Sequence, residues 1–141
     1  MPAVFERDGI RFQYPDNWSI DSQELDDGWS VTVQSPGTAF MTLSYHPGEW
    51  DCAVVTDSAL EALREEYPLV EADPAVETIA GQPAVGYDVR FYSLDLTNSA
   101  FIRGFACEDG CVLILSQLND LEDDRLGPVL RAVSASVEVE D

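Results

Sequence analysis

The chain has 141 residues, an apolar fraction of 45% and a formal net charge of −20. This length suits a single domain over residues 1–141 that needs no metal or disulfide to fold, and the apolar fraction is too high for a disordered chain. The negative charge repels phosphate groups, so we expect neither nucleic acid nor an anionic membrane surface as a partner.

The imbalance of charge has two interpretations. The 27 acidic residues stand against 7 basic ones, all of them arginine. The acids can be a solvated surface suited to a salty cell interior, or they can attract a basic partner over long range. The N-terminus lacks a basic region followed by an apolar stretch, so the sequence predicts no secretory signal and a cytoplasmic location.

Short apolar and aromatic runs bounded by turn residues predict strands in the first third of the chain. The predicted strands are Val4–Glu6, Ile10–Tyr14, Ser19–Glu24, Trp29–Ser35 and Phe40–Tyr45. Asp8-Gly9 favours a tight hairpin turn between the first two. Residues 46–55 have the composition of a loop.

A helix is predicted next. Thr56 or Asp57 can cap its first turn, and Pro68 ends it after about Glu66. Leu60 and Leu63 lie one helical turn apart, with Tyr67 one turn further, so these three side chains form a stripe that faces the core.

Four strands and a second helix are predicted in the rest of the chain. The strands are Val76–Ile79, Ala84–Leu94, Asn98–Cys107 and Cys111–Leu118, with a three-residue loop at 108–110. The last of them is apolar on both faces, which predicts a central position. The closing helix is expected to begin at Pro128, and Val137 with Val139 predicts an edge strand. The pattern therefore indicates an α+β fold, an antiparallel sheet of about seven strands with two helices packed on it.

Three short motifs resemble the PsbP-like superfamily. They are Ile10-x-Phe12-x-Tyr14-Pro15-x-x-Trp18, Ile79-x-Gly81-x-Pro83-Ala84 and Val133-x-x-Ser136-Val137. The resemblance extends over most of the chain and implies an α/β/α sandwich built on an antiparallel sheet. That superfamily includes photosystem II extrinsic proteins, a nuclear-import factor that binds the Ran GTPase, bacterial envelope lipoproteins and adaptor chaperones of type VI secretion. The resemblance implies a bacterial protein-binding or adaptor domain and no enzyme. The alternative is a small-molecule binder or hydrolase with a pocket between sheet and helix.

The cysteines and the single histidine are the residues with the greatest chemical potential. Cys107 and Cys111 flank a hairpin loop, where they can remain thiols, form a disulfide or contribute to a metal site. Zinc requires four ligands, and only His46 and Cys52 remain to complete the set. His46 has no nucleophile signature around it and is expected in a loop. The chain has no lysine, which excludes a P-loop. The sequence therefore predicts no catalytic, cofactor-binding or metal-binding residue.

Four residues are candidates for binding a protein partner. Trp29 and Trp50 are candidate aromatic anchors, with burial in the core as the alternative. Arg90 and Arg103 fall on neighbouring predicted strands, where they line a binding groove or form ion pairs with nearby acids. We expect the partner to be a protein, and a basic one if the acidic surface takes part in binding.

Overall fold

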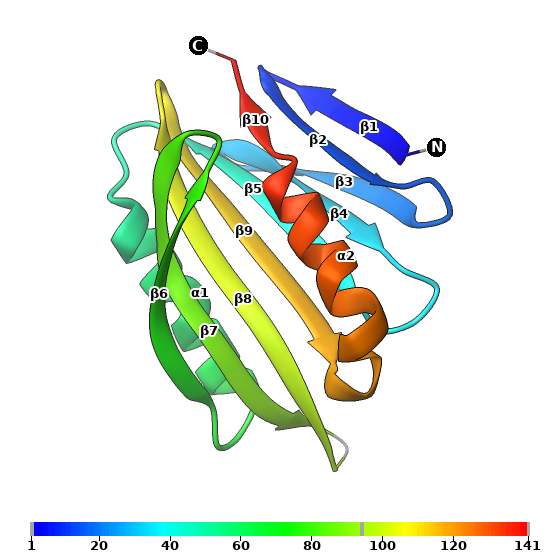
Figure 1. Ribbon diagram of the computed structural model, residues 1–141. Coiled ribbons are helices and arrows are strands. Elements are labelled where there is room, and N and C mark those ends of the chain that lie inside the picture. The colour runs from blue at the N-terminus through cyan, green and yellow to red at the C-terminus, as the bar shows by residue number, and fades with distance from the viewer. Residues whose placement is uncertain (1, 94, 141) are drawn as a thin grey trace.

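A seven-stranded antiparallel sheet forms the centre of the protein in a computed structural model that describes residues 2–93 and 95–140 (Figure 1). The strand order is β3-β4-β5-β9-β8-β7-β6. The strands are β3 (Ser19–Leu25), β4 (Gly28–Gln34), β5 (Phe40–Pro47), β6 (Glu71–Ile79), β7 (Gln82–Ser93), β8 (Leu96–Cys107) and β9 (Gly110–Asn119).

A smaller sheet and two helices complete the fold. The smaller sheet contains β1 (Pro2–Arg7), β2 (Ile10–Pro15) and β10 (Glu138–Val139). The helices are α1 (Cys52–Glu66) and α2 (Asp123–Ala135), the second preceded by a 3-10 turn, η1 (Asp120–Glu122). Within the described part of the chain, neither helix is long and apolar enough to cross a membrane.

The two faces of the large sheet are covered by different elements. Helix α1 packs on β7, β8 and β9 from one side, while α2 and the smaller sheet lie on the other side (Figure 1). The central strand β9 contributes to both layers because successive side chains of a strand point to opposite faces. Val112 and Ile114 belong to the apolar cluster beside α2, whereas Leu113 and Leu115 pack in the cluster beneath α1.

The structure confirms most of the predicted strands and the central position of β9, which has three strands on each side. The predicted stripe of α1 is also confirmed. Leu60 and Leu63 are buried against the sheet, and the ring of Tyr67 stacks on Phe91 with 4.2 Å between the ring centroids. The expected end of one strand at Leu94 lies outside the described residues.

The predicted loop at 46–55 is confirmed only for residues 48–51, and the predicted start of the first helix is wrong. Strand β5 continues through Pro47, and α1 begins at Cys52, four residues before Thr56. Asp51 is the cap, because its carboxylate accepts a hydrogen bond of 2.9 Å from the backbone N–H of Ala53. Thr56 lies inside the helix and is buried, so it cannot cap it.

Three further boundaries differ from the predictions. The β8–β9 hairpin has a two-residue connection, because Cys107 pairs directly with Gly110. Pro128 lies within α2 and not at its first position, so the helix gives up one backbone hydrogen bond there. Strand β6 begins at Glu71, well before Val76, and includes Pro74, which an edge strand tolerates because its outer N–H groups have no ladder partner.

Candidate functional site

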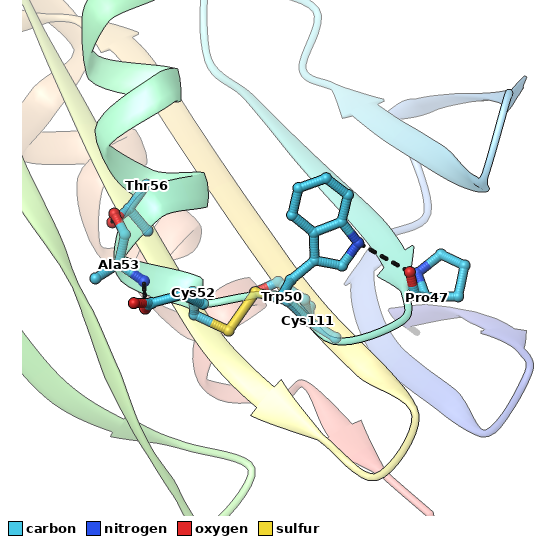
Figure 2. The surroundings of a disulfide bond; sticks show 8 residues. Pro47, Trp50, Cys52, Ala53, Thr56 and Cys111 are labelled. Carbon is cyan, nitrogen blue, oxygen red and sulfur yellow. Dashed lines mark hydrogen bonds between the residues drawn. A yellow bond between two sulfur atoms is a disulfide. The ribbon is translucent and has the colours of Figure 1, made fainter.

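The connection between β5 and α1 presents an exposed tryptophan in a fixed position. Backbone hydrogen bonds run from Gly48 N–H to the carbonyl of Asp109 (2.9 Å) and from Trp50 N–H to the carbonyl of Gly48 (3.1 Å). The indole N–H of Trp50 donates to the carbonyl of Pro47 at 2.8 Å, yet the side chain is 51% exposed (Figure 2). Its polar atom is therefore already satisfied, and the surface it offers to a partner is the apolar ring.

A disulfide between Cys52 and Cys111 anchors this connection to the centre of the sheet. The bond joins the first residue of α1 to β9, with the two Cα atoms 5.9 Å apart and the two cysteines separated by 59 positions in sequence (Figure 2). Cys111 is fully buried. The first turn of α1 is thus fixed covalently to the strand with the most burial. We refer to residues 46–54 together with Cys111 as the Trp50 corner.

This disulfide corrects the prediction for Cys107 and Cys111. Cys111 lies opposite Ala106 in the β8–β9 ladder, and Cys107 lies one residue further along. Their side chains therefore point to opposite faces of the sheet, where Cys111 bonds to Cys52 and Cys107 packs on the α2 side as a free thiol. Burial raises the pKa of the Cys107 thiol, which lowers its reactivity at neutral pH. The pairing of residues 59 positions apart leaves no local signal in the sequence.

The sequence had predicted a loop position for His46, but the residue lies on strand β5. It pairs with Cys111 across the ladder, and its ring lies edge-on to Trp50 with 6.3 Å between the ring centroids. The side chain is half-buried, and this burial lowers the pKa of the imidazole. Its Nε2 atom is buried with no hydrogen-bond partner among the described residues. What the structure shows for His46 is a ring packed against Trp50.

The outer surface of α1 continues from the Trp50 corner as an acidic face. We define the α1 acidic face by Trp50, Val54, Asp57, Glu61 and Glu65, all of them exposed. Val54 is 54% exposed although it is apolar. The exposed basic side chain on this helix, Arg64, is paired with Glu61 at 3.0 Å. The face therefore combines two apolar side chains with a surplus of negative charge.

A groove of about 420 Å³ lies on the opposite face of the sheet, between α2 and strands β6 to β9. Arg103 lines this groove and is 8% exposed. Its guanidinium donates to Glu77 (2.7 Å) and Asp88 (2.6 Å), and to the carbonyls of Tyr87 (3.1 Å) and Ile102 (2.9 Å). Four hydrogen bonds hold this buried cation. Of the two interpretations of Arg103 from the sequence, the structure supports ion pairs with nearby acids.

The other two sequence candidates lie apart from this network. Trp29 is 2% exposed, and its indole N–H donates to Asp8 at 2.9 Å, so Trp29 belongs to the core and is not an exposed anchor. Arg90 is exposed on β7, four residues beyond Gly86, which is the residue opposite Arg103. No ion pair of Arg90 occurs within the described part of the chain. The two arginines share a face of the sheet without sharing a site.

Metal binding finds no support in the side chains that the structure describes. Among residues 2–93 and 95–140, no group of three or more His, Cys, Asp or Glu side chains converges as metal ligands would. The acids on α1 lie along the helix surface, and those in the groove are bonded to Arg103.

Comparisons with known proteins match the fold and not the sequence. No protein-family model matches the chain, and no curated protein matches it. Cyanobacterial PsbP (CyanoP) from Synechocystis sp. PCC 6803 is similar with a TM-score of 0.68 and 14% identity, covering 99% of this chain and 92% of that one. The protein of unknown function PA94 from Pseudomonas aeruginosa is similar with a TM-score of 0.60 and 14% identity, covering 99% of this chain and 98% of that one. LpqN from Mycobacterium tuberculosis, involved in cell envelope biogenesis, is similar with a TM-score of 0.59 and 13% identity, covering 100% of this chain and 90% of that one.

These likenesses confirm the resemblance to the PsbP-like superfamily at the level of the fold. The chain has an α+β fold similar to that of cyanobacterial PsbP, with a seven-stranded antiparallel sheet and two helices. None of the three similar structures is described as an enzyme. Identities of 13% and 14% carry over no functional residue, so the function has to be argued from the surfaces of this chain.

Proposed function

We propose that the chain is a non-enzymatic protein-binding or adaptor domain that holds its partner on the α1 acidic face. The observation that carries this proposal is the side chain of Trp50, which is 51% exposed while its N–H is already bonded within the chain. Exposed tryptophans in a fixed conformation are frequent centres of protein interfaces, because they bury a large apolar area at little cost in conformational entropy.

The charge around Trp50 indicates the chemistry of the partner. Asp57, Glu61 and Glu65 lie along the exposed side of α1, and Arg64 is already paired with Glu61. A partner segment with arginine or lysine next to an apolar side chain would complement both the acids and the exposed Trp50 and Val54. The net charge of −20 would also accelerate the encounter with such a segment at low salt.

A site-specific crosslinking experiment tests the proposal. A photo-crosslinking amino acid replaces Val54, and the matched control places it at Val76, which is 71% exposed on β6. We expect one protein to be crosslinked in stoichiometric amount from position 54 in a native lysate, and none from position 76. The adduct should decrease in the Trp50→Ala variant and at high salt. Equal labelling from both positions, or no adduct from position 54, would contradict the proposal.

The fold comparisons are consistent with a non-enzymatic domain and specify no role for it. The PsbP-like resemblance also favours describing the layers as an α/β/α sandwich, although the smaller sheet shares one layer with α2. A cytoplasmic location stays a prediction from the sequence. The Cys52–Cys111 bond favours an oxidising compartment instead, because disulfides rarely persist in a reducing cytoplasm. Alkylation of thiols in intact cells, before lysis, distinguishes the two locations by labelling either Cys107 alone or all three cysteines.

Small-molecule binding is a second candidate function, and the groove above Arg103 is the observation that favours it. The groove has a size typical of ligand sites and lies between sheet and helix, where the alternative interpretation of the sequence expects a pocket.

A further inference from the structure

The groove between α2 and the sheet combines an apolar floor with polar side chains on both walls. Phe101, Ile114 and Leu130 provide the apolar surface. The volume of about 420 Å³ falls in the range of roughly 300–1,000 Å³ that is usual for small-ligand sites. The protein-binding role proposed for the α1 acidic face does not use this groove, which lies on the other face of the sheet.

The wall formed by β6 and β7 carries two oriented carboxylates. Arg103 binds one oxygen of Glu77 and one of Asp88, and these acid side chains are 49% and 52% exposed. The second oxygen of each carboxylate, Glu77 Oε1 and Asp88 Oδ2, accepts no hydrogen bond from the side chains and backbone that the structure describes. Two acids share one buried arginine, so this wall has an excess negative charge and acceptors in place for an ammonium group.

The wall formed by α2 carries the opposite charge. Arg131 lines the groove and is exposed, and it makes no ion pair with the side chains that the structure describes. A guanidinium binds a carboxylate through two parallel hydrogen bonds. The hydroxyls of Ser116 and Ser134 also line the groove and lie 3.5 Å apart, and a hydroxyl can both donate to and accept from a polar ligand.

We propose that this groove binds a zwitterionic ligand of the size of an amino acid or a dipeptide. The ammonium group lies on Glu77 and Asp88, the carboxylate lies on Arg131, and an apolar side chain covers Phe101. A purely cationic ligand is repelled by Arg131, and a purely anionic one by the two acids. A ligand that carries both charges and an apolar side chain complements every wall of the groove.

Titration calorimetry with the full chain and the dipeptide Leu-Leu tests this proposal. We expect saturable binding of Leu-Leu, and binding weaker by about tenfold or more when its amino group is acetylated or its carboxyl group is amidated, because each change removes one charged contact. No saturable binding of Leu-Leu, or equal binding of the blocked forms, would overturn the proposal.

Variants locate the binding in the groove. Arg131→Gln should remove the preference for the free carboxyl group over the amide and leave the preference for the free amino group intact. Glu77→Gln should do the reverse, since its amide oxygen can still accept from Arg103. Arg90→Gln is the matched control, an exposed arginine on the same face but outside the groove, and it should change neither preference. The proposal fails if Arg131→Gln retains the preference for the carboxyl group, or if Arg90→Gln loses it.

Discussion

The Trp50 corner and the groove above Arg103 lie on opposite faces of the same sheet and are stabilised by different interactions. The corner is fixed by a disulfide and by hydrogen bonds to backbone carbonyls. The groove depends on the ion pairs of Arg103 with Glu77 and Asp88. The comparison shows how a chain of strong negative charge can keep two surfaces ordered. One relies on a covalent bond and backbone hydrogen bonds, and the other concentrates a scarce cation where two acids meet.

The largest effect is expected from opening the disulfide. Cys52→Ala should lower the free energy of unfolding by about 4 kcal/mol, because a covalent link across 59 residues restricts the unfolded chain. Urea unfolding with and without a dithiol reductant measures this, and reductant should affect the wild type but not the variant. Cys107→Ala, which removes the free thiol, is the control and should cost much less. An unchanged wild-type midpoint in reductant would show that the bond does not stabilise the corner.

Removal of the buried cation should have the next largest effect. Arg103→Met should cost about 2 kcal/mol, because Glu77 and Asp88 lose their partner but are exposed enough to regain water. Arg90→Met is the matched control, with an expected change within about 0.5 kcal/mol, since Arg90 is exposed. Chemical denaturation of both variants gives the comparison directly. Equal losses would mean that the groove network adds nothing beyond ordinary surface charge.

A smaller, pH-dependent effect is expected at the Trp50 corner. Burial lowers the pKa of His46, so the folded protein binds the proton less readily than the unfolded chain does. Above the ordinary histidine pKa, the imidazole is neutral in both the folded and the unfolded state and does not affect stability. As the pH decreases below about 6.5 toward the lowered pKa of His46, the unfolded chain binds the proton first and the folded protein loses stability. Thermal melts between pH 5 and 8 should show this slope in the wild type and a shallower one in His46→Phe. Identical slopes would contradict the assignment.

The smallest effect concerns salt. Raising ionic strength to about 1 M shortens the Debye length to about 3 Å, so the loss caused by Arg103→Met should shrink while the loss caused by Cys52→Ala stays constant. The wild type itself should become more stable, because salt screens the repulsion within a chain of net charge −20. Denaturation of the three proteins at low and high salt separates these terms. A salt-dependent disulfide contribution would remove the distinction between the two regions.

Local patterns were sufficient for most of the fold and for few of the contacts. Alternating apolar residues predicted the strands, and apolar residues on both faces predicted the central position of β9, because burial on two sides demands it. The start of α1 was missed because Thr56 and Asp57 are also residue types that cap helices, and only the position of the chain relative to the sheet selects Asp51.

By itself, the sequence determined the α+β class and the order of most elements, since periodicity is a local property. The expectation that phosphate-bearing partners are repelled rests on the net charge and stays a prediction. Only the tertiary structure decided that Cys111 bonds to Cys52 and not to its neighbour Cys107, that Trp50 is exposed while Trp29 is buried, and that Arg103 is paired while Arg90 is exposed without an ion pair in the described part of the chain. Those outcomes depend on which face of a strand a side chain occupies and on what covers that face, and residues far apart in sequence provide the cover.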